Sequence, residues 1–411
     1  MKRKAMKRGY GALLWSLFLV DLGGAMVNIA LPLLLAQEYG VTFAVGLTFA
    51  AGILPRIVAS PFVGSLLVRF DPRPIAVISA LLTAPLVALL PLTHSLWQFQ
   101  VLNLTIGIVG ALAGPSRLAL RPLTIEEGEE LRGNGLLVAA ERVPVVLGPA
   151  LVGGVAAAGL DLRWTFWFPV VLAVIAALLI FRIPSSAQER EPSEAGKGFV
   201  RLIAEHTRLL LDLAVKDSFI RGLTLTGFTY VAAVSVGRLV LLGLSQERFT
   251  DAPGVYGWLL GAMSLGAIVG GALSGRLSRF HCGTLYLVGN VAEAIAWLGL
   301  IVVHDKIVSI VILFLAGVLE AIATVVFFAE VQRRVDAKLV GYYYAALMPV
   351  IDAFGMLGFV LGGALAPLGT TFSTLFVAAL MGLPVLLTAR WYYTDGKPAQ
   401  QAKVAGASSP T

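Results

Sequence analysis

The segment PIAVISALLTAPLVALLPLTHSLWQFQVLNLTIGIVGALAGPS, residues 74–116, contains no Asp, Glu, Lys or Arg. One membrane crossing takes roughly 20 residues, so this segment is about twice as long as a single span. It is interrupted at Pro91-Leu-Thr-His-Ser95. A chain surrounded by lipid must satisfy its own amide groups, and continuous apolar runs do so as helices, whereas barrel strands alternate over about ten residues. The segment therefore predicts a hairpin of two transmembrane helices.

The composition extends this prediction to the whole chain. Of the 411 residues, 58% are hydrophobic and 13% are charged, whereas about 25% of the residues in an ordinary globular domain are charged. These proportions exclude a soluble multi-domain enzyme and a disordered chain. We predict an all-α membrane protein with twelve transmembrane helices. The predicted spans are residues 11–36, 42–68, 74–93, 96–118, 134–158, 164–182, 219–244, 254–275, 283–303, 307–331, 341–366 and 370–393.

The basic residues predict the orientation in the membrane. Five of them precede the first span, which is too long for a cleaved signal peptide, so we expect this span to be retained. With twelve spans, 24 of the 31 Lys and Arg residues fall on the side of the N-terminus, and only Arg163, Arg248 and Lys306 fall on the other. Cytoplasmic loops carry the excess of basic residues. We expect a multi-pass protein of the bacterial inner membrane with both termini in the cytoplasm.

A polar stretch divides the spans into two sets of six. We predict an N-terminal six-helix bundle over residues 1–183, a cytoplasmic linker with an amphipathic helix over 184–218, and a C-terminal bundle with a short cytoplasmic tail over 219–411. The pattern G-x-L-x-x-R occurs at Gly64-Ser-Leu66-Leu-Val-Arg69 and again 207 residues later at Gly271-Ala-Leu273-Ser-Gly-Arg276, each time after the second span of a half. This recurrence indicates two pseudo-symmetric bundles, and secondary transporters place their substrate at the interface of such repeats.

Ionisable residues within the spans point to the function. Each charged residue that faced lipid at a helix centre would cost about 2.5–3.5 kcal/mol of insertion free energy. These residues must therefore pair between helices or line a water-filled pathway. For the set as a whole we favour the pathway. A carboxyl group in a low-dielectric cavity holds its proton more tightly, and a nearby arginine opposes this, so such a group can couple protons to transport. Our candidates for proton coupling, in order, are Asp21, Glu320, Asp352 and Glu141.

Polar residues and glycines also form stripes along single faces of the predicted helices. Asn103, Gly107, Gly110, Gly114 and Arg117 follow one another at steps of three and four residues. Plain packing of small residues is the alternative explanation, which we prefer for the pairs Gly266/Gly270 and Gly358/Gly362. The candidate substrate contacts and charge partners are Arg56, Arg117, Arg142, Arg238, Asn28, Asn103, Phe228 and Tyr230. We expect Glu293 at the bundle periphery, and Trp97, Trp164, Trp167, Trp258, Trp391 and Tyr392 as interface anchors.

The chain resembles the major facilitator superfamily. The family's loop signature after its second helix is G-x-L-x-D-R-x-G-R-R, and Gly64, Leu66, Arg69 and Arg73 match it here. Val68 stands at the acidic position, which puts in doubt the cytoplasmic latch that this acid forms in the family. Gly148-Pro149-Ala-Leu-Val-Gly153-Gly154 is similar to the antiporter signature G-P-x-x-G-G with one residue inserted. By this resemblance Gly64, Arg69, Arg73, Gly148, Pro149, Gly153, Gly271 and Arg276 are the conformational motif residues.

The resemblance implies transport by alternating access, with helices 1, 4, 7 and 10 around a central cavity. Gly114-Pro-Ser-Arg117 and the acidic loop after it look like the branch of macrolide efflux pumps and enterobactin-type siderophore exporters. We expect proton-coupled efflux of small amphipathic compounds such as drugs. The alternative is an exporter or facilitator of one metabolite, siderophore or lysolipid.

Other classes of function have less support in the sequence. An integral-membrane enzyme is a further alternative, but no metal-ligand cluster, nucleophile–base pair or phosphate loop is recognisable. We therefore expect no cofactor, no metal and no enzymatic activity. We also expect no nucleic-acid partner, because the basic residues are explained by membrane orientation. The expected partners are protons, the lipid bilayer and a small-molecule substrate, bound by a monomer.

Overall fold

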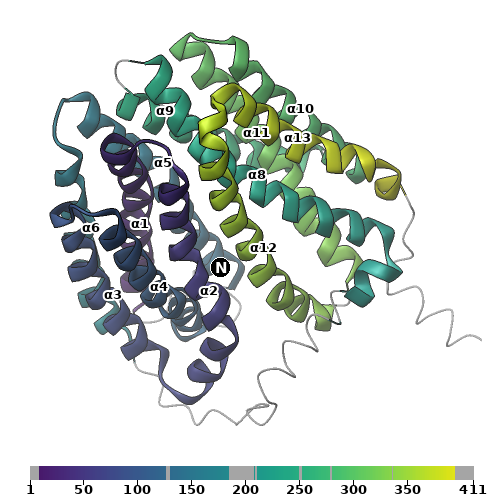
Figure 1. Ribbon diagram of the computed structural model, residues 1–411. Helices are drawn as coiled ribbons and strands as arrows, with labels where there is room; N and C mark the ends of the chain where they lie inside the picture. The colour runs from purple at the N-terminus through teal and green to yellow at the C-terminus, as the bar shows by residue number, and fades with distance from the viewer. Residues whose placement is uncertain are drawn as a thin grey trace, which may run out of the picture. The chain divides into compact units, whose positions relative to one another are not determined.

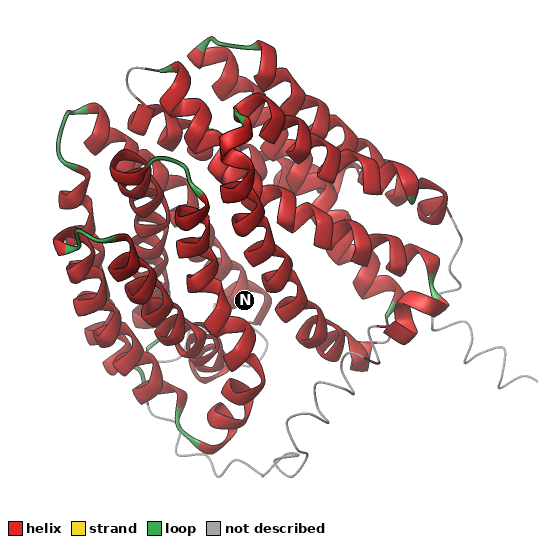
Figure 2. Ribbon diagram, in the orientation of Figure 1, coloured by secondary structure: helices red, strands yellow, loops and turns green. Residues whose placement is uncertain are grey.

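The computed structural model describes residues 9–125, 130–184, 208, 211–249, 252–277, 280–335 and 337–393. Within these residues the chain is helical and contains no strand (Figure 2). Figure 1 labels the long helices. They are α1 (Tyr10–Tyr39), α2 (Phe43–Arg69), α3 (Pro72–Leu89), α4 (Leu96–Thr124), α5 (Glu130–Ala157), α6 (Trp167–Phe181), α8 (Ser218–Arg248), α9 (Ala252–Ser274), α10 (Cys282–Val302), α11 (Lys306–Arg334), α12 (Ala337–Leu365) and α13 (Thr370–Leu387).

These helices confirm the predicted fold class. Eleven helices of the described part are long and apolar enough to cross a membrane, and Phe43–Ala59 within α2 is a shorter apolar stretch. Each helix overlaps one predicted span. Of the predicted linker with its amphipathic helix, residues 211–216 are helical, while residues 185–207, 209 and 210 lie outside the described residues.

Polar caps fix where several helices begin. Thr42 accepts a hydrogen bond from the backbone N–H of Val45 at the start of α2. Asp71 accepts one from the backbone N–H of Arg73 at 3.0 Å, with Pro72 as the first residue of α3. Each cap satisfies an amide that the first helical turn leaves without a partner. These two side chains therefore stabilise the first turns of α2 and α3.

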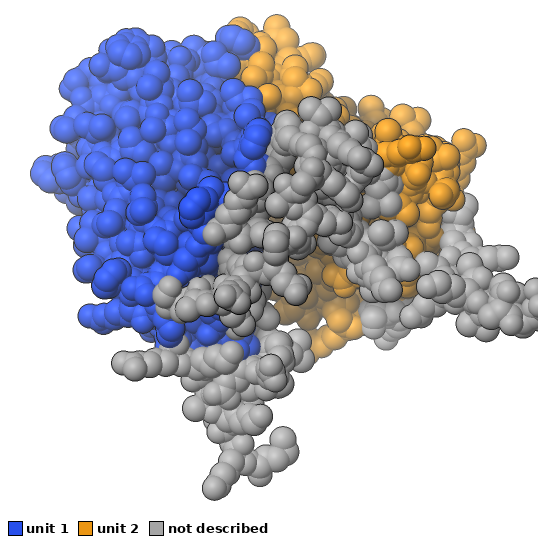
Figure 3. Space-filling model, turned by 90° about the horizontal axis from the view of Figure 1, so that it is seen from below, with its two compact units in different colours: residues 1–197, 242–261 blue, residues 198–241, 262–411 orange. Residues whose placement is uncertain are grey.

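The described chain forms two compact units, which Figure 3 colours separately. Unit 1 consists of residues 1–197 and 242–261, and unit 2 of residues 198–241 and 262–411. In unit 1, α1 packs on α5 and α6, α3 packs on α4 and α6, and α2 packs on α4. In unit 2, α10 packs on α11 and α13. Close glycine contacts add the pairs α8–α12 and α9–α11 to unit 2.

Glycines at matching positions show that the two units repeat one packing scheme. Gly107 is the twelfth residue of α4, and Gly317 is the twelfth residue of α11. A Cβ atom at Gly107 would collide with the carbonyl oxygen of Gly52 on α2, and one at Gly317 with the carbonyl oxygen of Met263 on α9. Helix backbones can approach this closely only where no side chain intervenes. The corresponding helices of the two units therefore cross at corresponding places.

The close contacts of Gly266, Gly270 and Gly358 confirm that these glycines serve helix packing. Added Cβ atoms at Gly266 and Gly270 would collide with the carbonyl oxygens of Phe314 and Val318 on α11. An added Cβ at Gly358 would meet the carbonyl oxygen of Ala232 on α8. These residues hold helices together inside unit 2.

The prediction that Tyr392 is an anchor at the membrane surface is wrong. It is fully buried, and its ring contacts Phe219 and Tyr286 in the core of unit 2. Its hydroxyl group lies 2.8 Å from that of Thr388 and donates to the hydroxyl of Thr226 at 3.3 Å. The short 3-10 helix Ala389–Tyr393 turns this ring inward, although a tyrosine at a span end is typical of the membrane surface.

Candidate functional site

The first predicted acid, Asp21, forms an ion pair inside unit 1. Arg117 on α4 donates from Nη1 to Oδ1 of Asp21 on α1 at 3.1 Å. The two side chains are only 16% and 26% exposed, respectively. A partly desolvated pair of this kind interacts more strongly than one in water. The structure therefore joins the leading proton-coupling candidate to a predicted charge partner.

A second ion pair lies beside the first. Arg121, one turn after Arg117 on α4, donates to Glu141 on α5. Arg121 and Glu141 also lie close enough to Asp21 for their charges to act on it. We call Asp21, Arg117, Arg121 and Glu141 the unit 1 charge cluster. It brings three predicted residues together with one that the sequence analysis missed, and the spacing of four residues between the two arginines was the available signal.

Glu293 is not at the periphery of its bundle. Its side chain on α10 is fully buried, and Tyr230 on α8 donates to its two carboxylate oxygens at 3.0 and 3.2 Å. Glu320 on α11 lies near enough for its charge to act on Glu293. The expectation of a peripheral position is therefore wrong, because α10 turns this face toward α8 and α11. Tyr230, predicted as a substrate contact, holds this acid.

The other predicted site residues lie apart from these pairs or at their edges. Glu320 and Asp352 are half-buried on α11 and α12. Asn103 donates to the backbone carbonyl of Thr48 at 2.6 Å and so fastens α4 to α2. Phe228 stacks on Phe354 with ring centroids 4.9 Å apart. The exposed residues of the set are Arg56, Arg142, Arg238 and Asn28.

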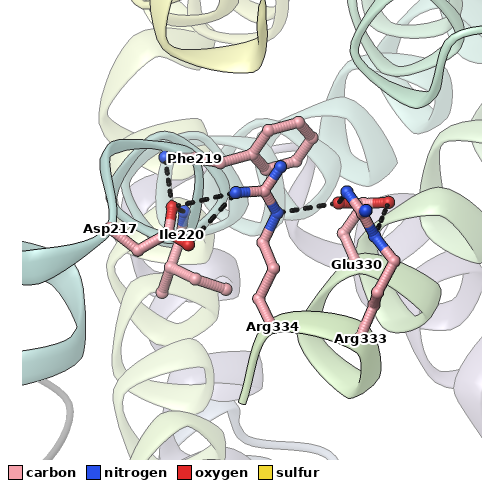
Figure 4. A network of polar contacts seen from close by, with 6 residues as sticks. All are labelled: Asp217, Phe219, Ile220, Glu330, Arg333 and Arg334. Atoms are coloured by element: carbon pink, nitrogen blue, oxygen red, sulfur yellow. Dashed lines mark hydrogen bonds and ion pairs between the residues drawn. The ribbon is translucent and has the colours of Figure 1, made fainter. Parts of the chain in front are cut away.

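A charged network at the end of α11 escaped the sequence analysis. Figure 4 shows Glu330 between the guanidinium groups of Arg333, at 2.6 Å, and Arg334, at 2.8 Å. Arg334 also reaches Asp217 at 3.1 Å and lies over the ring of Phe219 at 4.1 Å. Asp217 accepts hydrogen bonds from two backbone amides at the start of α8. An acid followed by arginines three and four residues later is the sequence signal for such a network.

The departure from the loop signature has a structural role. Asp71 stands where the signature has glycine, and its side chain caps α3. Arg73, which matches the signature, lies over the ring of Phe181 at 4.8 Å. Gly64 and Arg69 belong to α2, Gly271 to α9, and Arg276 is exposed in the short 3-10 helix Gly275–Leu277.

The glycine and proline motif of α5 lies at two helix crossings within unit 1. A Cβ atom at Gly148 would collide with the side chain of Ala25 on α1. At Gly257, on α9, a Cβ atom would lie against the backbone carbonyl of Pro149 and against Gly153. Gly148 is the nineteenth residue of α5, and Gly355, which packs against Val231 of α8, is the nineteenth of α12. The motif thus sets how closely α5 approaches α1 and α9.

Comparisons with known proteins agree with this architecture. The model of the Major Facilitator Superfamily matches residues 13–249. The multidrug efflux pump Tap of Mycolicibacterium fortuitum is 26% identical over 393 residues, which cover 89% of this chain and 90% of Tap. The multidrug resistance protein MdtG of Dickeya zeae is 31% identical over 136 residues, which cover 33% of each chain.

A solved structure supports the fold. The crystal structure of the nucleoside transporter NupG superposes with a TM-score of 0.75 at 10% identity, covering 94% of this chain and 100% of NupG. The family match spans more than half of this chain, and the apolar helices are those of a multi-pass membrane protein. The protein is therefore a non-enzymatic transporter of small molecules that belongs to the Major Facilitator Superfamily.

Proposed function

We propose that the protein is a proton-coupled exporter of small amphipathic compounds that works by alternating access. The observation that carries the proposal is the ion pair between Asp21 and Arg117, which lies within two membrane-spanning helices of unit 1. An ion pair within a membrane span costs desolvation free energy. Its presence therefore indicates a role in transport or in holding helices together. A proton that binds the carboxylate cancels its charge and ends the pair.

The proton cycle follows from that chemistry. A proton arriving from outside binds Asp21 and releases the Arg117 guanidinium. Loss of the proton to the cytoplasm restores the pair. A bound compound that favours one of these two states shifts the conformational equilibrium by its difference in affinity for them. Glu320, Asp352 and Glu141 are the further candidates for this role, in that order.

The relatives support efflux of drugs. Tap and MdtG are named as a multidrug efflux pump and a multidrug resistance protein, and Tap covers most of this chain. We extend their substrate class to this protein as part of the proposal. As part of the proposal, the protein lies in the bacterial inner membrane. The distribution of Lys and Arg supports an orientation with both termini in the cytoplasm.

A second candidate is export of an anionic metabolite, siderophore or lysolipid. The exposed side chains of Arg142 and Arg238, both within spans, favour it because guanidinium groups bind carboxylates and phosphates bidentately. In this case Arg142→Gln and Arg238→Gln would weaken binding of an anion and leave binding of a lipophilic cation unchanged.

Transport into liposomes tests the proposal. Purified protein is reconstituted with an imposed pH gradient, and uptake of ethidium, a fluorescent lipophilic cation, is followed. The proposal predicts that ethidium uptake depends on the pH gradient and that transport dissipates this gradient. Uptake that ignores the gradient would contradict proton coupling. If only anionic compounds from a panel with a siderophore and a lysolipid are carried, the second candidate holds.

A further inference from the structure

Glu293 is a buried acid that the proposed proton cycle does not use. It lies near the middle of α10, and its side chain has no exposed surface. Tyr230 on α8 donates to both of its carboxylate oxygens. No Lys or Arg of the described chain forms an ion pair with it. A buried carboxylate without a cation is unfavourable, so this packing suits the neutral, protonated acid.

The helices around Glu293 contribute a second acid. They also carry arginines, Arg221 and Arg238 on α8 and Arg333 and Arg334 on α11, but none of these forms an ion pair with Glu293 within the described residues. α11 contributes Glu320, whose charge acts on Glu293. α13 packs on α10 and carries no titratable residue. Tyr286, on α10 itself, lies 2.7 Å from the hydroxyl of Thr226. Arg390, Tyr392 and Tyr393 belong to the segment that packs at the start of α10, where a Cβ at Gly283 would meet the backbone of Tyr392.

A buried indole gives a second sign of a functional site. Trp297 follows Glu293 by one helical turn and is 1% exposed. Its N–H lies toward the Glu293 carboxyl group without reaching normal hydrogen-bond geometry, and it makes no other hydrogen bond within the described structure. Buried polar atoms are usually satisfied. When the Glu293 carboxyl group is ionised, it can therefore accept a hydrogen bond from the N–H of Trp297.

A purely structural hydrogen bond is the competing explanation. A glutamine at this position would bond to Tyr230 equally well and would carry no risk of a buried charge. A glutamic acid behaves differently, because it can bind and release a proton, and the negative charge of Glu320 makes its ionised form less favourable. The chemistry of the position is thus that of a proton-binding group.

We propose that Glu293 is a proton-binding residue of this transporter and that Tyr230 is the positioning residue that holds its carboxyl group. The proposal rests on the proposed proton-coupled function. Loss of the proton from Glu293 leaves a negative charge, which the Tyr230 hydroxyl and the Trp297 N–H stabilise as donors. A movement of α8 that withdraws Tyr230 removes one of these donors, so the protonation of Glu293 follows the conformation of unit 2.

Infrared spectroscopy of the purified full chain in detergent tests this inference with protons as the only ligand. The carbonyl stretching band of protonated carboxyl groups is recorded across a pH series. We expect Glu293→Gln to remove one titrating band and Tyr230→Phe to shift that band. Glu320→Gln should change the pH at which the band disappears, because one of two like charges is gone. Tyr286→Phe, which removes another buried hydroxyl from the same unit, should leave the band in place.

The outcomes separate this inference from the proposed function. The inference is overturned if Glu293→Gln keeps every titrating carboxyl band. It is also overturned if Tyr286→Phe shifts the band as much as Tyr230→Phe does. An unchanged titration of the band in Glu320→Gln overturns it as well. If Glu293→Gln does not fold, Tyr230→Phe keeps the acid and decides the question. Proton antiport of ethidium can persist in each of these cases. Conversely, a titrating Glu293 in a protein that carries ethidium without using the pH gradient contradicts the proposed antiport and leaves the proton site standing.

Discussion

Arg117 on α4 and Asp21 on α1 form an ion pair with 3.1 Å between Nη1 and Oδ1, and both side chains are largely shielded from solvent. The same α4 face reaches Glu141 on α5 through Arg121 one turn later. One helix therefore links the charges of two others. Neutralising one member of this cluster changes the electrostatic balance among three helices at once, which is what a proton-driven conformational change requires.

Replacement of Asp21 tests the proton role of this pair. We expect Asp21→Asn to lower gradient-driven ethidium transport by about tenfold or more, each factor of ten being about 1.4 kcal/mol. The amide cannot exchange a proton at accessible pH, so Arg117 stays permanently without an anionic partner at this position. Asp21→Glu keeps a carboxyl group and should retain part of the activity. Transport at the wild-type rate in Asp21→Asn would exclude Asp21 as the carrier.

The pair between Arg121 and Glu141 should contribute to stability. We expect Arg121→Gln to lower the free energy of unfolding, measured by titration with SDS, by about 1–3 kcal/mol. Adding Glu141→Gln should cost little more, since the partner is already lost. Arg142→Gln alters an exposed neighbour and should change this free energy by less than about 0.5 kcal/mol. Additive losses in the double variant would show that the two side chains are independent.

The two arginines at the end of α11 should differ in importance. Arg334 is 6% exposed and joins Glu330 to Asp217, whereas Arg333 is 54% exposed and, among the described residues, forms an ion pair with Glu330 only. We expect Arg334→Gln to cost about 2–3 kcal/mol, because Asp217 loses this cation and the buried Glu330 keeps only the exposed Arg333. Arg333→Gln should cost about 1 kcal/mol or less. Equal shifts in melting temperature for the two variants would contradict the network of Figure 4.

The close helix crossings predict a contrast between neighbouring glycines. Gly107→Ala places a Cβ against the Gly52 backbone and should destabilise the protein by about 1–3 kcal/mol. Gly110→Ala, on the same helix, meets nothing within 4 Å. It should leave stability unchanged or raise it by up to about 1 kcal/mol, because alanine favours helix. Thermal unfolding in detergent distinguishes the two. A stable Gly107→Ala protein would mean that α2 and α4 can separate without cost.

The sequence predicted the helices well because apolar length alone determines a membrane span. The ends were harder to place. Helix α4 continues to Thr124 rather than ending at residue 118, because Arg121 finds Glu141 as a partner inside the bundle and need not lie in a polar loop. Tyr392 points inward for a similar reason, since Thr226 and Thr388 satisfy its hydroxyl.

The pairing of the acids was less predictable. Spacing along one helix places residues on a face, but only the rotation of each helix decides which neighbour that face meets. Glu293 shows this, because the sequence carries no sign that α10 turns it toward Tyr230. Asn103 shares a face with Arg117 by periodicity, yet it bonds to α2 while Arg117 bonds to α1, because α4 crosses both helices at different heights.

Proton release on substrate binding tests the central claim most directly. A compound that raises the melting temperature of the purified protein is added to it in weakly buffered detergent solution, and the pH is followed. Proton antiport predicts saturable release of protons that is lost or strongly reduced in Asp21→Asn and Glu320→Gln. Saturable binding of the compound with no release, or release that both variants retain in full, would contradict it.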